Sequence, residues 1–416
     1  MVALLHDAAT RRDVRVIGVV SFAHATSHFF HLLLPPLFPW LMADFSLNFT
    51  QVGALMSVFF VVSGTGQALA GFAVDRFGPG RVLLFGVSSL ALSGFALAAA
   101  SSYAMLALAA GLAGLGNSVF HPVDFTILNR RVSPQRLGYA FSAHGLSGNL
   151  GWAVAPVFMA GIAGLAGWHW AGFAAGLLAT IVLATLLWQR ALLEVREPVT
   201  HATPGPAASA APTFAFLSSS AVWLCFGFFF VLSGALSVVQ TYAPTLLNRL
   251  YGLSLAASTS SFTAYLLAGA VGVAIGGFVA GRGRSQDRVI TFALAVSACC
   301  ALLLASAVFP GWSVIGLMAL LGMGVGVAGP SRDLLIRQAA TAGFGREAYG
   351  RVYGFVYSGL DVGFAVAPLV FGPLMDHGHY SAALVGVALL LGASILTALS
   401  VGVLARVGRR VVAGAG

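Results

Sequence analysis

The sequence predicts an all-α polytopic membrane protein whose twelve transmembrane helices form two pseudo-symmetric six-helix bundles. The first observation behind this prediction is composition: 59% of the 416 residues are hydrophobic and 8% are charged, a balance that does not fit a soluble enzyme. The second is that apolar segments of roughly 20 residues, the length that crosses a bilayer, recur along the whole chain. The third is an internal repeat that relates the two halves of the sequence.

Twelve apolar segments are the predicted helices in chain order. Their centres lie near Phe29, Val61, Leu90, Val119, Leu150, Ile181, Leu232, Leu267, Val296, Gly326, Phe364 and Leu390. Because the number is even, both chain ends lie on one side of the membrane. Arginines collect in the connections after the even-numbered segments and in the C-terminal tail, whereas the opposite connections hold only Arg249. The positive-inside rule therefore predicts that both termini are cytoplasmic.

The same arginines account for the net charge of +9. They lie in short connections between apolar segments, as membrane topology requires, so we expect no nucleic-acid partner. Cys225, Cys299 and Cys300 lie inside apolar segments and lack the spacing of a metal or redox motif. We therefore expect neither a disulfide nor a cofactor.

A segment rich in proline, alanine and charge, residues 194–213, separates the two sets of six predicted helices. Such a composition is typical of a flexible linker. We therefore expect an N-terminal six-helix bundle over residues 1–193, a cytoplasmic linker over 194–213 and a C-terminal six-helix bundle over 214–416.

The two sets of helices repeat one another in sequence. Ser46–Arg76 aligns without gaps on Gly252–Arg282, with leucine and glycine positions in common, and Arg136–Pro156 aligns with Ala348–Pro368. Since both halves run in the same orientation, we expect an axis along the membrane normal to relate them.

Polar residues interrupt the fourth predicted helix in the run Gly114–Arg131. Asn117, His121 and Asp124 are spaced i, i+4 and i+7, which places them on one stripe of a helix. Ionisable groups in a spanning helix are costly, so they face a bundle interior or an aqueous cavity and commonly mark a pathway. The alternative is a packing patch whose polar groups are satisfied by neighbouring helices.

The connection GFAVDRFGPGR, Gly71–Arg81, contains glycine, three residues, Asp-Arg, one residue, glycine and a basic residue. Together with twelve helices and a two-half repeat, it resembles the signature connection of the major facilitator superfamily. Ser27–Leu41 (SHFFHLLLPPLFPWL) and Ser118–Pro122 (SVFHP) resemble the fosmidomycin-resistance branch, whose members are proton-driven exporters of small toxic compounds. The chain departs from that branch after Phe-His-Pro, where Val123 precedes Asp124.

The resemblance implies that Asp75 helps to close the cytoplasmic side when the central cavity opens outward; the alternative is a solvated loop charge. Gly281 stands at the equivalent position of the second half, so we expect an asymmetric latch. His144, Gly145, Gly148 and Gly151 permit close approach where the family packs its two halves together. The predicted gating residues are Gly71, Asp75, Arg76, Gly78, Arg81, Gly148 and Pro156.

Three histidines of the first predicted helix, His24, His28 and His31, share one face at i, i+4 and i+7. In the family that the chain resembles, the first helix of each half lines the cavity, which implies a substrate-binding role for these histidines together with Asn117 and His121. A zinc or copper site formed by the three histidines is an alternative by spacing. Without a cysteine or a nearby carboxylate, we predict no metal site.

Two acids, Asp361 and Asp124, are the predicted proton carriers. Asp361 lies roughly 18 Å along the eleventh predicted helix, close to the bilayer midplane. A carboxylate in a partly dry cavity can bind and release a proton as access alternates. For Asp361 the alternative is a structural hydrogen bond across helices, helped by Tyr357 one turn before it.

Arg332 lies opposite Asp124 in the internal repeat. It is included among the predicted substrate-binding residues, as a counter-charge for an anionic substrate or for Asp124. The alternative assigns it, with Asp333 and Arg337, to the cytoplasmic end of the tenth predicted helix.

These features predict a secondary transporter that rocks its two halves around a central site. The preferred mode is proton-coupled export of a small organic molecule, and the alternative is proton-coupled uptake of a small organic anion such as a carboxylate. From a different class, the chain could be a non-transporting membrane receptor or a His-ligated membrane metalloenzyme, although no closed ligand set is found for an enzyme. We expect a functional monomer in the bacterial inner membrane, with substrate, protons and the lipid bilayer as its partners.

Overall fold

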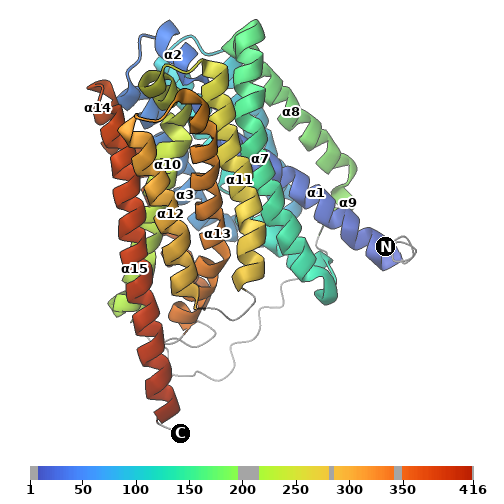
Figure 1. Cartoon of the computed structure of the whole chain (residues 1–416). Coiled ribbons are helices and arrows are strands. Elements are labelled where there is room, and N and C mark those ends of the chain that lie inside the picture. The colour runs from blue at the N-terminus through green and yellow to red at the C-terminus, as the bar shows by residue number, and fades with distance from the viewer. Residues whose placement is uncertain (1–7, 195–214, 281–284, 342–348, 415–416) are drawn as a thin grey trace. The chain divides into compact units, whose positions relative to one another are not determined.

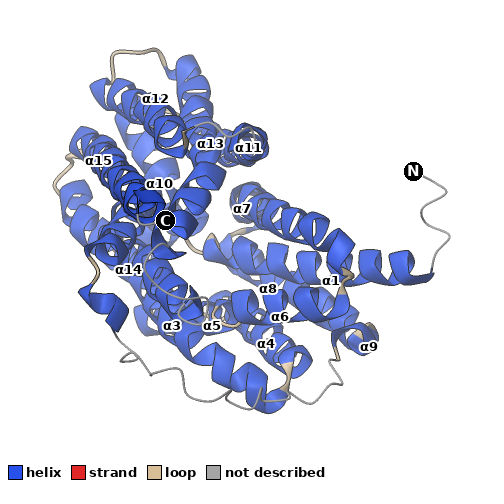
Figure 2. Ribbon diagram, turned by 90° about the horizontal axis from the view of Figure 1, so that it is seen from below, coloured by secondary structure: helices blue, strands red, loops and turns tan. Residues whose placement is uncertain are grey.

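The structure of the chain is a computed structural model in which all regular elements of the described residues are helices (Figure 1). No strand occurs in this part of the chain (Figure 2). The described residues are 8–194, 215–280, 285–341 and 349–414.

The contacts within the chain divide it into two compact units, Met1–His201 and Ala202–Gly416. The division falls inside the segment 194–213, for which the sequence predicts a linker. Residues 195–214 lie outside the described part of the chain, so the cytoplasmic linker stays a prediction.

The N-terminal unit consists of long helices joined by short helical turns. Its elements in chain order are α1 (Ala8–His31), η2 (Pro35–Leu37), α2 (Phe38–Asp44), α3 (Phe49–Phe77), α4 (Pro79–Ala98), α5 (Tyr103–Asn117), α6 (Phe120–Arg131), η3 (Pro134–Arg136), α7 (Leu137–Ala166), α8 (Trp168–Trp188) and α9 (Arg190–Leu193). Within this unit α1 packs against α7, α4 lies between α5 and α8, and α3 packs against α5.

The C-terminal unit is built in the same way. Its described elements are η4 (Ala215–Ser218), α10 (Ser220–Tyr251), α11 (Leu255–Ala280), α12 (Gln286–Ser306), η5 (Gly311–Ser313), α13 (Val314–Thr341), α14 (Tyr349–Asp376) and α15 (Tyr380–Gly414). Within this unit α10 packs against α14 and α15, and α13 packs against α11 and α12.

The described residues contain 12 helical spans that are long and apolar enough to cross a membrane, six in each unit. This number confirms the twelve transmembrane helices expected from hydropathy. The first and fourth spans are each made of more than one helix: Ala9–Asp44 contains α1, η2 and α2, and Tyr103–Arg131 contains α5 and α6.

The fourth span therefore differs from the single helix that the sequence analysis assumed. α5 ends at Asn117 and α6 begins at Phe120. Pro122 has no N–H with which to bond the carbonyl of Ser118, and it is tolerated here because it lies in the first turn of α6. The break separates Asn117 from His121 and Asp124, which stand on the next helix.

Helices α1 and α7 approach each other until their backbones touch. A Cβ atom on Gly151 of α7 would lie 2.1 Å from the carbonyl oxygen of Ala25 on α1, so only glycine fits at this crossing. Small residues at a crossing let helix backbones approach closely in a membrane, where van der Waals packing is a main source of association. This contact brings the side chains of α1 next to those of α7.

In the C-terminal unit, α10 is held against α14 by hydroxyl groups that donate to main-chain oxygens. Pro368 lies inside α14 and cannot donate to the carbonyl of Phe364, the residue four positions earlier. Ser237 of α10 donates to that oxygen at 3.0 Å, and Tyr242 donates to the Pro368 oxygen at 2.8 Å. Neighbouring helices commonly supply such bonds at prolines in the membrane.

Candidate functional site

The N-terminal unit gathers five histidines and one aspartate, which we call the histidine cluster. Its members are His24, His28 and His31 of α1, His121 and Asp124 of α6, and His144 of α7. The structure thus brings together the two polar stripes that the sequence analysis found on separate helices, and adds His144 to them.

Asp124 is the acid of the cluster and its side chain is fully buried. His144 Nε2 forms a hydrogen bond with Asp124 Oδ2 at 3.0 Å. His24 Nδ1 lies 3.0 Å from the same oxygen, within ion-pair distance, although its ring is not aligned for a hydrogen bond. Asp124 Oδ1 has no hydrogen-bond partner among the described residues. The carboxyl group is therefore shared by two imidazoles through a single oxygen.

The imidazoles contact one another through their rings. The His24 and His144 rings stack with centroids 3.5 Å apart, and the His24 and His28 centroids are 4.4 Å apart. The His28 and His31 rings also stack, with centroids at 4.9 Å. The His121 ring lies 5.4 Å from that of His24 between centroids. A continuous row of rings consequently runs along α1.

Gly148 of α7 makes room for this row. A Cβ atom at Gly148 would lie 2.8 Å from His28 Nδ1 and 3.1 Å from His24 Nε2, closer than ordinary van der Waals contact. The predicted close packing at Gly148 is observed, but the neighbours described here belong to α1 of the same unit. Pro156, the other predicted gating residue of α7, is buried inside this helix.

Asn117 closes the far end of the row. Its Oδ1 accepts from the hydroxyl of Ser27 at 2.6 Å and lies 2.8 Å from His31 Nε2, while its Nδ2 donates to Ser63 at 2.7 Å. Because the amide oxygen can only accept, His31 carries a proton on Nε2. These contacts agree with the alternative interpretation of Asn117, in which its polar groups are hydrogen-bonded by neighbouring helices.

His121 has a partner on α3. Its Nδ1 lies 3.2 Å from Oε1 of Gln67, and its side chain is partly buried. Ser63 and Gln67 share one face of α3 at i and i+4, so this helix supplies uncharged polar partners to the residues on both sides of the break in the fourth span.

Several buried polar atoms of the site have no hydrogen-bond partner among the described residues. They are both ring nitrogens of His28, His31 Nδ1, Asp124 Oδ1 and Trp152 Nε1. A buried polar atom without a partner costs about 1–3 kcal/mol. Such a group of atoms marks a place where a proton, a water molecule or a polar substrate group can be bound.

The sequence analysis missed some of these residues. Ser27, Ser63 and Gln67 gave no signal, because a single hydroxyl or amide in an apolar helix is common. His144 did give one: it is spaced i, i+4 and i+7 with Gly148 and Gly151, so the glycine face that packs on α1 also presents an imidazole.

Asp361, the other predicted proton carrier, lies on α14 in the C-terminal unit and is partly buried. No hydrogen bond or ion pair of its carboxyl group occurs within the described residues. Tyr357, one turn before it, donates to Asp333 at 3.1 Å. The structural hydrogen bond considered as the alternative for Asp361 is thus absent from the described part of the chain.

Arg332 of α13 is paired within its own unit. Its Nε donates to Oδ1 of the adjacent Asp333 at 2.8 Å, and its guanidinium carbon lies 5.1 Å from the centre of the Phe229 ring. This contact joins neighbours in the sequence and does not place Arg332 at the cytoplasmic end of the helix, so the alternative interpretation stays a prediction. The contact of Arg332 with a substrate or with Asp124 also stays a prediction.

The predicted gating residues of the α3–α4 connection lie at the surface. Gly78 has φ +81° and joins the two helices, a conformation that favours glycine. Gly71, Asp75, Arg76 and Arg81 are exposed. Arg76 lies 5.3 Å from the centre of the neighbouring Phe77 ring, and the described side chains offer Asp75 no ion pair.

Two subsets of the cluster are close enough to share a metal ion by distance alone. They are His24, His28 and His121, and His24, Asp124 and His144, with ligand atoms within 4.8 Å of one another. In the second subset, the Asp124 oxygen already stands 3.0 Å from both imidazole nitrogens. Zinc holds its ligands at about 2.0–2.1 Å, which leaves ligand atoms roughly 3 Å apart, so these spacings do not exclude a metal ion. The prediction of no metal site assumed that no carboxylate lay near the α1 histidines, and the position of Asp124 contradicts that assumption. The same groups also suit proton and hydrogen-bond chemistry, which is the chemistry that we assign to them.

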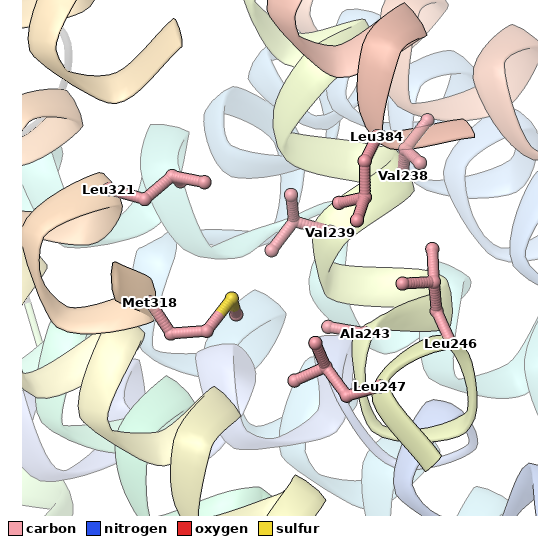
Figure 3. A pocket seen from close by; sticks show the side chains of 8 residues that line it. All are labelled: Val238, Val239, Ala243, Leu246, Leu247, Met318, Leu321 and Leu384. Atoms are coloured by element: carbon pink, nitrogen blue, oxygen red, sulfur yellow. The ribbon is translucent and has the colours of Figure 1, made fainter. Parts of the chain in front are cut away.

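A separate small pocket lies in the C-terminal unit (Figure 3). Its lining is entirely apolar, and none of the predicted site residues contributes to it. The lining residues are Val238, Val239, Ala243, Leu246, Leu247, Met318, Leu321 and Leu384.

Comparison with known families and curated proteins places these features among transporters. Residues 20–368 match the model of the Major Facilitator Superfamily. The chain is 30% identical to the fosmidomycin resistance protein of Escherichia coli K12 over 275 residues. The aligned region is 64% of this chain and 65% of the relative. The chain is 26% identical over 359 residues to the probable nitrate/nitrite transporter NarK2 of Mycobacterium tuberculosis, covering 83% of this chain and 85% of the relative.

Solved structures share the fold. The crystal structure of a variant of the nucleoside transporter NupG superposes with a TM-score of 0.73 at 13% identity, covering 94% of this chain and 99% of that one. At this identity the likeness concerns the fold alone.

Proposed function

Because the chain belongs to the Major Facilitator Superfamily of transporters, we propose that it exports a small organic molecule in exchange for protons. Family membership makes it a multi-pass membrane transporter and not an enzyme. Export, proton coupling and alternating access of the two units are the proposed part. The observation on which the proposal rests is the buried carboxyl group of Asp124 between His24 and His144.

A fully buried carboxyl group can change its charge only at a large energetic cost unless a partner changes with it. A buried carboxylate is stable when an imidazolium pairs with it, and a buried carboxylic acid is stable beside neutral imidazoles. Adding or removing one proton therefore changes the charge balance at the core of the N-terminal unit. If one conformation of the transporter is more stable with the proton bound and another without it, the conformational change is coupled to proton binding.

Asp361 is proposed as a second proton carrier, in the C-terminal unit. It is partly buried, and its lack of a described partner leaves both carboxyl oxygens open to a proton. Asp361 and Asp124 must each be substituted in turn, because the acid that couples transport to protons is one of the two.

His28, His31, Asn117 and His121 are proposed to hydrogen-bond the substrate. The open nitrogens of His28 and His31 can bind polar groups of a ligand. The predicted gating residues of α3, α4 and α7 keep their proposed roles, with Asp75 available on the surface for a contact formed during the transport cycle.

The choice of export rests on similarity to a drug-resistance protein, the fosmidomycin resistance protein. The second candidate, uptake of a small anion, is supported by the similarity to a probable nitrate/nitrite transporter and by the cationic side chain of Arg332. The two modes differ in the direction of the substrate relative to the proton, so one experiment can separate them.

Transport by membrane vesicles tests this function. Fosmidomycin and nitrate are the first probes, followed by small organic acids that raise the unfolding temperature of the purified protein. Export by proton exchange predicts accumulation in everted vesicles acidified inside. Uptake with protons predicts accumulation in right-side-out vesicles acidified outside, and a receptor would accumulate no probe in either.

Substitution of the acids tests the proton site. We expect Asp124→Asn to slow gradient-driven transport by about a hundredfold, while exchange of labelled for unlabelled probe continues. His144→Gln should act in the same direction, because it replaces the titratable imidazole beside Asp124 by an amide that cannot take up a proton. Full gradient-driven transport in both Asp124→Asn and Asp361→Asn would refute the proposed coupling.

A further inference from the structure

We propose that His24, His28 and His31 form a proton path along α1, with His28 as the link between Asp124 and His31. This inference rests on the proposed proton site at Asp124 and goes beyond it, because it assigns the route by which the proton reaches that site.

The main observation is that both ring nitrogens of His28 are buried but form no hydrogen bond with the described residues. A structural histidine in a helix bundle normally donates one ring nitrogen to a neighbour, as His31 does to Asn117. An imidazole with two open nitrogens can accept a proton on one and release a proton from the other.

His28 lies between two other imidazoles. Its ring centroid is 4.4 Å from that of His24 and 4.9 Å from that of His31, and the rings must turn before their nitrogens form a hydrogen bond. His31 Nε2 carries the proton that it donates to Asn117, so Nδ1 is the acceptor on that ring. His31 can therefore accept a proton that comes from Asp124 by way of His24 and His28.

Gly148 adjoins one nitrogen of each ring in the step from His24 to His28. His24 Nε2 and His28 Nδ1 lie 3.1 Å and 2.8 Å from the position of a Cβ atom on that glycine. Both nitrogens thus face one point that holds no side chain. Filling this point would separate them, which provides a specific way to block the path.

Protons balance at each step. When the His24 ring turns to align Nδ1 with Asp124 Oδ2, Asp124 can give it a proton: the O–H bond breaks, an N–H bond forms, and a carboxylate faces an imidazolium. His24 then releases a proton from Nε2 to His28, whose opposite nitrogen releases one to Nδ1 of His31. His31 becomes the imidazolium and keeps its Nε2–H bonded to Asn117 Oδ1, which accepts the hydrogen bond but not the proton. One proton has then moved from Asp124 to His31, and the reverse sequence returns it.

The charged form of His28 has a partner in Trp152. The two rings lie 4.4 Å apart between centroids, and an aromatic ring stabilises a nearby cation. The titratable groups facing His28 are His24 and His31 on its own helix, His121 and Asp124 on α6, and His144 on α7. The nearby side chains of α3 and α5, including Ser63, Gln67 and Asn117, are uncharged.

The contact with Trp152 provides a test that needs no substrate. A protonated imidazole quenches the fluorescence of an adjacent indole, and the difference between the intact protein and Trp152→Phe isolates that signal from the other tryptophans. After a rapid drop in pH, we expect quenching in the intact protein. His28→Gln should abolish it, and Asp124→Asn should alter the pH at which it is half complete.

Gly148→Ala is the variant that blocks the path, and Gly145→Ala is its matched control. A Cβ atom at Gly145, one turn earlier on α7, would meet nothing within 4 Å. We expect quenching in Gly148→Ala to be slower by about a hundredfold, with Gly145→Ala unchanged. If Gly148→Ala does not fold, the test is made with His28→Gln, whose fluorescence quenching and gradient-driven transport are both expected to be lost.

Two results would overturn the path. One is quenching with an unaltered rate in Gly148→Ala or His28→Gln. The other is full gradient-driven transport in His28→Gln while Asp124→Asn has lost it, which would leave the proton site intact and remove only the route. Full transport in Asp124→Asn, by contrast, would count against the proton site itself.

Discussion

The carboxyl group of Asp124 shows how a membrane helix can tolerate an acid. Its two neighbours are imidazoles, the side chains that exchange protons most readily near neutral pH. Three titratable groups in contact can move one proton among themselves without creating an unpaired buried charge. An arginine partner would have fixed the charge of Asp124, whereas imidazoles leave it adjustable.

The side chain of Asn117 forms hydrogen bonds with three other side chains. Asn117→Ala would leave the hydroxyls of Ser27 and Ser63 and the Nε2 proton of His31 without this partner. Each buried group left unsatisfied costs about 1–3 kcal/mol, so we expect a clearly lower unfolding temperature. Thermal unfolding of the purified protein measures it.

Asn129→Ala is the control for this prediction. Asn129 is exposed on α6 and donates only to the Phe125 oxygen of its own helix. Such a surface change is expected to alter stability by less than about 0.5 kcal/mol. Equal unfolding temperatures for the Asn117 and Asn129 variants would show that the Asn117 network contributes nothing to stability.

At the scale of elements, the face of α7 that bears His144, Gly148 and Gly151 decides the geometry of the site. Gly151 lets the backbones touch, Gly148 leaves space for two imidazoles, and His144 reaches Asp124. The interruption between α5 and α6 completes the arrangement, because it gives Asn117 and Asp124 separate partners. The site is therefore a property of helix contacts and not of one motif.

The α1–α7 crossing is open to a direct test. Gly151→Ala places a Cβ atom against the main-chain oxygen of Ala25, which cannot rotate away as a side chain can. We expect a loss of about 1–3 kcal/mol in stability from overpacking, measured by unfolding in detergent, together with weaker His144–Asp124 coupling.

Gly161→Ala, on the same helix, is the matched variant. A Cβ atom there would meet nothing within 4 Å. Since alanine favours helix over glycine, this change is expected to leave stability equal or to raise it by up to about 1 kcal/mol. A stable Gly151 variant would mean that the crossing adjusts without cost.

For the whole molecule, charge distribution sets the orientation in the membrane. The arginine bias between the two sets of connections predicts cytoplasmic termini. A green fluorescent protein fused to the C-terminus should therefore fluoresce, because it folds in the cytoplasm. Alkaline phosphatase inserted after Gly252, in a connection on the side opposite to the termini, should be active. An inactive phosphatase together with a C-terminal fusion that does not fluoresce would contradict the predicted topology.

The family, the number of spans and the residues of the cluster could be read from the chain because they depend on local properties. Apolar length defines each span, and spacing along α1 and α6 identifies the polar stripes. The spacing of Asn117, His121 and Asp124 predicts one stripe on one helix, however, because a residue spacing does not show that the helix is interrupted before Pro122.

The sequence by itself determined that this protein is a twelve-helix transporter with histidines and acids inside its spans. Only the tertiary structure decided which of these groups meet: it placed Asp124 beside His24 and His144, and it left both ring nitrogens of His28 without a hydrogen bond to the described residues. The physical reason is that partners across helices depend on crossing points such as Gly148 and Gly151. At these crossing points Gly148 adjoins His24 and His28, and Gly151 adjoins Ala25. These residues lie more than about a hundred positions apart in the sequence, so no local pattern predicts their contact.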